Sequence, residues 1–121
     1  MISSKLTLTW RNGNEAGGHR YGAASGDCGK PRPALIIQSN LFNETHASIV
    51  VCLMTSHLLD APLFRITVYP SERNALEVAS QIMVDKIVAI RREKIRTRIG
   101  VLDEETMLRV NSSLMLFLGL A

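Results

Sequence analysis

The C-terminal segment constrains the fold most, because residues 103–118 carry the clearest helix signature in the chain. Asp103 is a suitable N-cap, and Glu104 and Glu105 suit the positive end of a helix dipole. Gly119 is typical of a helix C-terminus. Four apolar residues then recur at three- and four-residue spacing: Met107, Val110, Leu114 and Phe117. The pattern predicts one amphipathic helix that closes the chain.

The apolar runs before this helix are short and rich in β-branched residues, which is typical of strands. They predict strands at residues 5–10, 34–38, 47–54, 64–69 and 81–90. A helical turn is expected at residues 91–95. Several short strands followed by one helix indicate a mostly β, α+β fold, a small, partly open β-barrel with a C-terminal helix.

Composition limits the protein class further. The chain has 121 residues, 46% of them hydrophobic and 5% aromatic, which suits one domain with an aliphatic core. No apolar run approaches the roughly 18 residues of a membrane span, and the first residues do not resemble a signal peptide, so we expect a cytoplasmic protein. Cys28 and Cys52 form no metal or disulfide framework, and Cys52 is expected to be buried in a strand.

Positive charge is concentrated in one place. The net charge is +3, and five basic residues stand close together: Arg91, Arg92, Lys94, Arg96 and Arg98. Such a run is compatible with a polyanionic partner. The alternative is a solvated charged surface, which is the commoner explanation.

A basic, proline-restricted loop leads into the strand expected at residues 34–38. Pro31 and Pro33 fix their own φ angles and push Lys30 and Arg32 toward extended geometry. Arg32 is therefore held firmly at the beginning of a buried strand, where a guanidinium can bind a phosphate. The alternative is a solvated surface turn.

A second polar group ends the strand expected at residues 47–54, and it consists of Thr55, Ser56 and His57. If this strand pairs antiparallel with the one that Arg32 begins, the cation and the hydroxyls share one rim. A guanidinium beside a hydroxyl suits a phosphodiester, since the cation stabilises developing charge and the hydroxyl holds or relays a proton. The alternative is that Thr55 and Ser56 only cap a turn.

Four motifs in this order resemble the MazF/PemK-type toxins of bacterial type II toxin–antitoxin systems. They lie within residues 26–120 and read GDCGKPRPALIIQS (26–39), LMTS (53–56), SQIMVDKI (80–87) and RIGVLDEETM (98–107). The resemblance implies an SH3-like barrel and a homodimer that cleaves single-stranded RNA at short sequences without a metal or other cofactor. It also implies a cognate antitoxin whose disordered tail folds on binding.

The resemblance assigns the catalytic roles residue by residue. Arg32 matches the family's catalytic arginine before a proline, and Thr55 matches its catalytic threonine. Asp85 lies near an acidic position used by some members. His57 is a further acid–base candidate from its residue type and its place after Thr55 and Ser56, not from the resemblance. Met83 stands where certain members carry an arginine, so this chain departs from a two-arginine mechanism.

Candidates for RNA contact are the basic and hydroxyl residues around these positions: Lys30, Ser56, Lys86, Arg91 and Arg92. Plain structural roles stay open as alternatives. Asp85 beside Lys86 is also what a structural pair at a strand edge looks like. A histidine such as His57 is also common on surfaces.

The N-terminal part departs from the family pattern. Residues 1–16 are an atypical extension, and residues 17–121 correspond to the toxin domain. Glycines at 17, 18 and 22 stand where the first strand of the family is expected, and glycine weakens strands. Either residues 1–10 supply that strand, or the barrel is incomplete. The alternatives to a ribonuclease are a degenerate module that binds antitoxin or RNA without cleavage and, third, the gyrase-poisoning branch of the superfamily.

Overall fold

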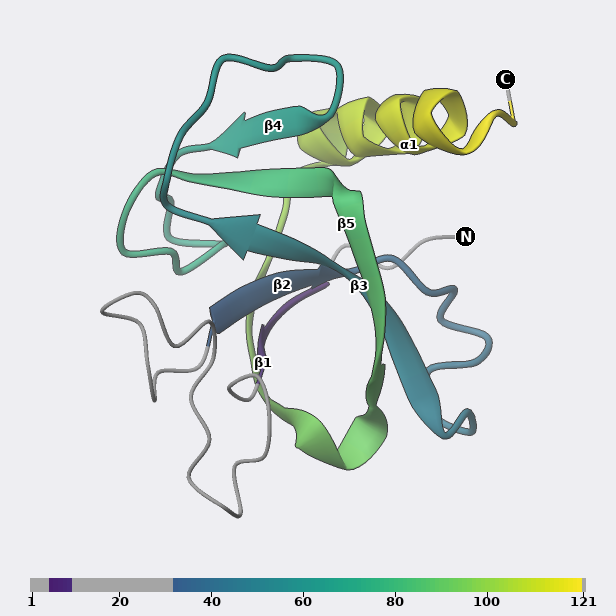
Figure 1. The fold of residues 1–121 in the computed structure, drawn as a ribbon. Helices are drawn as coiled ribbons and strands as arrows, with labels where there is room; N and C mark the ends of the chain where they lie inside the picture. The colour runs from purple at the N-terminus through teal and green to yellow at the C-terminus, as the bar shows by residue number, and fades with distance from the viewer. Residues whose placement is uncertain (1–4, 10–31, 121) are drawn as a thin grey trace.

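The structure is a computed structural model that describes residues 5–9 and 32–120 (Figure 1). A 3-10 turn, η2 (Arg92–Lys94), precedes the last strand, and one α-helix, α1 (Glu104–Leu118), follows it. The strands in chain order are β1 (Lys5–Thr9), β2 (Arg32–Ile36), β3 (Ser48–Thr55), β4 (Arg65–Val68), β5 (Ser80–Arg91) and β6 (Ile95–Val101). Mostly β structure with a closing helix confirms the predicted α+β class.

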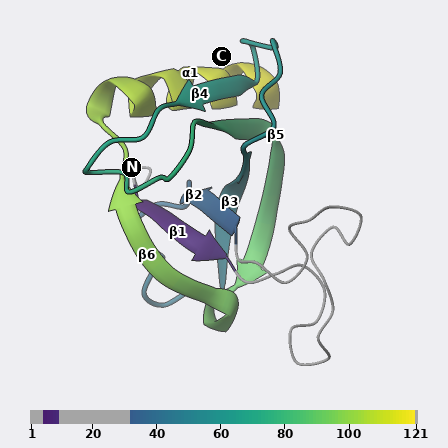
Figure 2. The same cartoon turned by 90° about the vertical axis from the view of Figure 1, so that its left-hand side faces the viewer.

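The six strands form one antiparallel sheet in the order β4-β5-β3-β2-β1-β6. The order ends on β4 and β6, so the curled sheet is the partly open barrel that the sequence predicted. Strand β1 lies between β2 and β6, as Figure 2 shows. Residues 5–9 therefore supply a strand of the sheet, which is the first of the two alternatives that the sequence left open.

Strand β5 bends in its middle (Figure 1), and it pairs with β4 and with both ends of β3. Its first part pairs with β4 and with the end of β3, and its last part pairs with the beginning of β3. Between these parts, Met54 pairs with Ile82 but Cys52 pairs with Ile87. Residues 83–86 of β5 thus oppose a single residue of β3, a bulge that bends the strand and re-aims its side chains.

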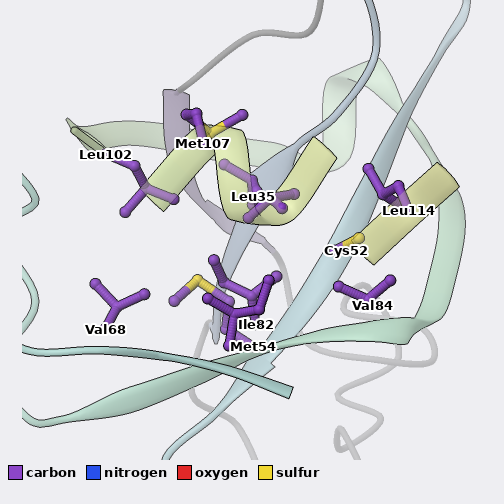
Figure 3. Close-up of a cluster of buried hydrophobic side chains, with 11 residues drawn as sticks. Leu35, Cys52, Met54, Val68, Ile82, Val84, Leu102, Met107 and Leu114 are labelled. Carbon is purple, nitrogen blue, oxygen red and sulfur yellow. The ribbon is translucent and has the colours of Figure 1, made fainter. Parts of the chain in front are cut away.

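The larger core lies between the helix and one face of the sheet (Figure 3). It is aliphatic, as the low aromatic content predicted, and the side chain of Cys52 is buried in it. Burial raises the pKa of the Cys52 thiol to about 12, and the negative charge of Asp85 adds to the rise. The other ten buried members are Leu35, Met54, Ile66, Val68, Ile82, Val84, Leu102, Met107, Val110 and Leu114.

A smaller core lies on the opposite face of β2 and β3. Its buried members are Ala34, Ile36, Ile49, Val51 and Ile90, and Leu53 and Ile95 pack against them. Because side chains alternate along a strand, two cores on opposite faces explain why these runs are apolar almost throughout.

Both ends of α1 are capped as the sequence predicted. The carboxylate of Asp103 accepts a hydrogen bond from the Thr106 N–H at 2.8 Å. Hydrogen bonding with the Thr106 side chain, and secondly with this N–H, lowers the pKa of Asp103. Gly119 ends the helix in the left-handed conformation, with φ 74°. Phe117 was expected on the buried stripe but is 50% exposed. Ser113 is buried instead and donates its hydroxyl to the Leu63 carbonyl at 2.6 Å.

Strand β6 was not expected from the sequence. Its basic residues hide the period-2 pattern, and its pairing with β1 depends on a strand distant in the sequence. In the part of the chain that the structure describes, no helix combines the length and apolar character needed to cross a membrane.

Candidate functional site

Arg32 and Thr55 lie at the same rim of the sheet, as the sequence predicted. Strands β2 and β3 are antiparallel, and Ala34 pairs with Leu53. The same register, continued by two residues, puts Arg32 at the beginning of β2 opposite Thr55 at the end of β3. Both residues are half-buried.

The two residues also share one face of the sheet. Ala34 and Leu53 contribute to the smaller core, and Arg32 and Thr55 each lie two positions from one of them. Since side chains two positions apart point to the same side of a strand, Arg32 and Thr55 extend the face of the smaller core toward the rim. Two side chains on one face at adjoining strand ends are placed to approach the same phosphate.

Thr55 is also the first residue of a turn. Its Oγ1 accepts a hydrogen bond from the His57 N–H at 3.0 Å, which is the turn-capping contact considered above. That bond uses a lone pair of the hydroxyl and leaves its proton to be donated elsewhere. The two residues that follow, Ser56 and His57, are exposed at the rim. Capping and phosphate binding are therefore compatible roles for Thr55.

Gln81 is a residue of this rim that the sequence did not single out. It is the register partner of Thr55 in β3 and of Thr67 in β4, and only 4% of it is exposed. Its Oε1 accepts from the Leu59 N–H at 3.0 Å, and its Nε2 donates to the Leu59 carbonyl at 2.8 Å. Nε2 also lies 3.1 Å from the hydroxyl of Thr67. The available signal was a polar amide directly before the apolar run at residues 82–84.

Asp85 lies in the bulge of β5 and pairs with a residue that the sequence did not suggest. Its Oδ1 lies 4.0 Å from Nε of Arg65 in β4, and the two side chains are 23% and 11% exposed. Lys86, the neighbour considered as its partner, is exposed. The structure thus gives Asp85 a cross-strand ion pair.

Arg91 and Arg92 lie at the other end of β3, away from Thr55. Arg91 pairs with Ser48, and the two ends of this eight-residue strand lie about 23 Å apart. The side chain of Arg92 donates to the carbonyl of Asn43, and its backbone N–H donates to Ala47 at 3.0 Å. Arg92 therefore fastens the loop between β2 and β3, and neither arginine joins the Arg32–Thr55 rim.

Lys30, expected to contact RNA, lies outside the described residues. Among residues 5–9 and 32–120, no three His, Cys, Asp or Glu side chains gather where they could hold a metal ion.

Comparison with known proteins places these features in a family. The family model described as "PemK-like, MazF-like toxin of type II toxin-antitoxin system" matches residues 11–118. A relative from Mycolicibacterium smegmatis, named "Probable endoribonuclease MazF", is 42% identical over 93 residues, 77% of this chain and 84% of the relative. "Endoribonuclease EndoA" of Bacillus subtilis is 28% identical over 92 residues, 76% of this chain and 79% of the relative.

Solved structures with the same fold agree with this match. The Mycobacterium tuberculosis toxin MazF-mt6 superposes with a TM-score of 0.74 at 14% identity, covering 97% of this chain and 98% of the toxin. An endoribonuclease from a mycobacterial species, solved in complex with its cognate antitoxin, gives 0.70 at 17% identity over 100% and 97% of the two chains. By the extent of the family match and the identity to the mycolicibacterial relative, the chain belongs to the PemK-like, MazF-like toxins of type II toxin–antitoxin systems.

Proposed function

We propose that this toxin is an endoribonuclease that cleaves single-stranded RNA without a metal ion. The observation that carries the proposal is the antiparallel register of β2 and β3, which brings a cation, Arg32, and a hydroxyl, Thr55, to one rim and one face. Two relatives named endoribonucleases support the same activity.

The reaction is an internal transfer of a phosphate. The ribose 2′-oxygen forms a bond to the adjacent phosphorus while the bond to the 5′-oxygen breaks, leaving a 2′,3′-cyclic phosphate and a 5′-hydroxyl. One proton leaves the 2′-hydroxyl and one is delivered to the departing oxygen. Negative charge grows on the phosphate oxygens in the transition state, where a fixed guanidinium such as Arg32 stabilises it.

Each rim residue has a place in this reaction. Arg32 holds the scissile phosphate, and the Thr55 hydroxyl donates a hydrogen bond that orients it. His57, exposed two positions further on, is the acid–base candidate nearest to Thr55 along the chain. Asp85 acts through its ion pair with Arg65 and belongs to the support of β4 and β5 rather than to the reacting atoms.

The remaining parts of the proposal concern partners and location. Ser56 at the rim contacts the RNA backbone, and so does Lys30, which stands two positions before Arg32 in the sequence. Exposed Lys86 adds positive charge. We expect inhibition by a cognate antitoxin, because one structural neighbour was solved with its antitoxin. The family resemblance adds the expectation of a cytoplasmic homodimer. Residues 5–9 act as part of the toxin domain, since β1 pairs with both β2 and β6.

The test is cleavage of a single-stranded RNA by the purified full-length chain in excess EDTA, compared with Arg32→Ala and Arg32→Lys. We expect cleavage by the wild type, products with 5′-hydroxyl ends, and a loss of at least 100-fold in Arg32→Ala, since one electrostatic donor is worth about 10²–10³ in rate. If the wild type and both Arg32 variants bind the RNA and none of the three cleaves it, the result would instead support a non-catalytic module.

A further inference from the structure

Residues 56–60, the first part of the loop between β3 and β4, are tied to β5 by the buried side chain of Gln81. Both polar atoms of the Gln81 amide bond to the backbone of the same residue, Leu59: Oε1 accepts its N–H at 3.0 Å and Nε2 donates to its carbonyl at 2.8 Å. Gln81 and Leu59 are 22 positions apart, so this two-point contact ties distant segments together. A buried amide left without such partners would be costly, which keeps the contact in place.

The first part of this loop, residues 56–60, has little else to fix it. The later part is held by the Ser113 hydroxyl, which donates to the Leu63 carbonyl at 2.6 Å, and by the Val84 N–H, which donates to the Phe64 carbonyl at 2.9 Å. Residues 56–60 are all exposed, and the side chains of Leu58 and Leu59 are 47% and 45% exposed, so apolar packing contributes little. A segment with few buried contacts opens easily unless hydrogen bonds hold it. Its first anchor is the bond from the His57 N–H to Thr55, and its second is the Gln81 amide.

Gln81 also lies beside Thr55, the residue with the candidate catalytic hydroxyl, on the neighbouring strand. It is the register partner of Thr55, and the register of β2 and β3 continues the row to Arg32. The loop leaves the sheet at Thr55 and returns to Gln81 at Leu59, so the direction of the turn that Thr55 caps depends on the second anchor.

We propose that Gln81 is a positioning residue of the ribonuclease site: its amide clamps Leu59 and thereby holds the turn after Thr55 in the geometry that cleavage requires. The inference rests on the proposed function. Misplacing a reacting group by about 1 Å can lower a rate 100-fold, whereas binding of the RNA backbone by charge is less sensitive to such a shift.

The test compares Gln81→Met with Gln38→Met, a matched control. Gln38 makes the same kind of two-point contact, from Nε2 to the Ser48 carbonyl at 3.2 Å and from the Val50 N–H to Oε1 at 3.1 Å, but at the other end of β3. Both changes keep side-chain length and remove the amide. Cleavage of single-stranded RNA gives kcat and KM, and amide hydrogen exchange reports the opening of residues 56–60.

In Gln81→Met we expect kcat to fall at least 10-fold, KM to change less than 3-fold, and the Leu59 amide to exchange faster. Gln38→Met should keep kcat within 2-fold and leave exchange in residues 56–60 unchanged. Equal losses in both variants, or unchanged exchange in Gln81→Met, would overturn the positioning role. If the wild type cleaves no RNA, the proposed function fails and the positioning role with it, while exchange still reports whether the clamp exists.

Discussion

Nε of Arg65 lies 4.0 Å from Oδ1 of Asp85, an ion pair between β4 and the bulge of β5 in which both side chains are largely buried. At this distance the pair is held by charge, because neither Nε of Arg65 nor Oδ1 of Asp85 has a hydrogen-bond partner among residues 5–9 and 32–120. The negative charge of Asp85 also contributes to the raised pKa of the neighbouring buried thiol. The charge of Asp85 in β5 thus interacts with Arg65 in β4 and with the thiol of Cys52 in β3.

Asp85→Ala should therefore lower the free energy of unfolding by about 2 kcal/mol, because it leaves the largely buried Arg65 charge without its partner. The double variant Arg65→Met/Asp85→Ala should recover part of the loss. Urea denaturation gives the free energy of unfolding of the single and the double variant, with Lys86→Ala as a nearby exposed control. A large fall in cleavage rate without loss of stability would instead place Asp85 among the catalytic residues.

Thr55→Val should lower RNA cleavage at least 10-fold, because valine keeps the shape of the side chain but removes the hydroxyl that orients the phosphate. The same change removes the acceptor for the His57 N–H. Thr55→Ser keeps a hydroxyl and should retain most activity. Initial rates on one RNA substrate compare the three proteins, and equal rates in Thr55→Val and wild type would exclude a role of the hydroxyl in cleavage.

Arg92→Ala should destabilise the protein by about 1 kcal/mol, since the side chain donates a hydrogen bond to Asn43 across 49 positions of sequence. Arg91→Ala, at the exposed neighbouring position, should change stability by less than about 0.5 kcal/mol. Thermal unfolding of the two variants makes the comparison. A pair of equal, small effects would show that the loop does not depend on Arg92.

Gly100→Ala should cost about 2 kcal/mol of stability, because an added Cβ would overlap backbone atoms. It would lie 2.7 Å from the carbonyl carbon and oxygen of Asn74 and closer still to the carbonyl oxygen of Arg73. Gly119→Ala serves as the control: its Cβ meets no atom within 4 Å, and only the φ of 74° opposes it, which costs about 1 kcal/mol. Chemical denaturation should rank Gly100→Ala as the less stable variant, and the reverse order would contradict the close approach.

The buried thiol of Cys52 predicts a loss of stability at high pH. Its pKa is raised from 9.0 to about 12 in the folded protein, so above pH 9 the unfolded chain loses this proton while the folded protein keeps it. Ionisation then favours the unfolded chain, and stability falls between pH 9 and about pH 12. Cys52→Ala should show a shallower fall over that window in urea denaturation. Parallel curves for the two proteins would mean that the thiol ionises alike in both states.

Short windows of the sequence predict the local elements other than β6, and they predict that Arg32 and Thr55 share one rim. Alternation and β-branched residues are visible in any short window, and so are a helix cap, an apolar stripe and a terminal glycine. Arg32 and Thr55 follow from these elements, because the beginning of one strand meets the end of its antiparallel neighbour whatever the loop between them does. The four motifs in family order completed the assignment.

The contacts that hold this rim and its supports could be known only from the folded chain. Gln81 with Leu59, Arg65 with Asp85 and Arg92 with Asn43 are all distant in sequence. Two of them depend on β5: Gln81 on the register of β5 against β3 and β4, and Asp85 on the bulge at residues 83–86. A shift of one residue in that register would turn Gln81 and Asp85 to the other face, and no local pattern in the sequence encodes the register.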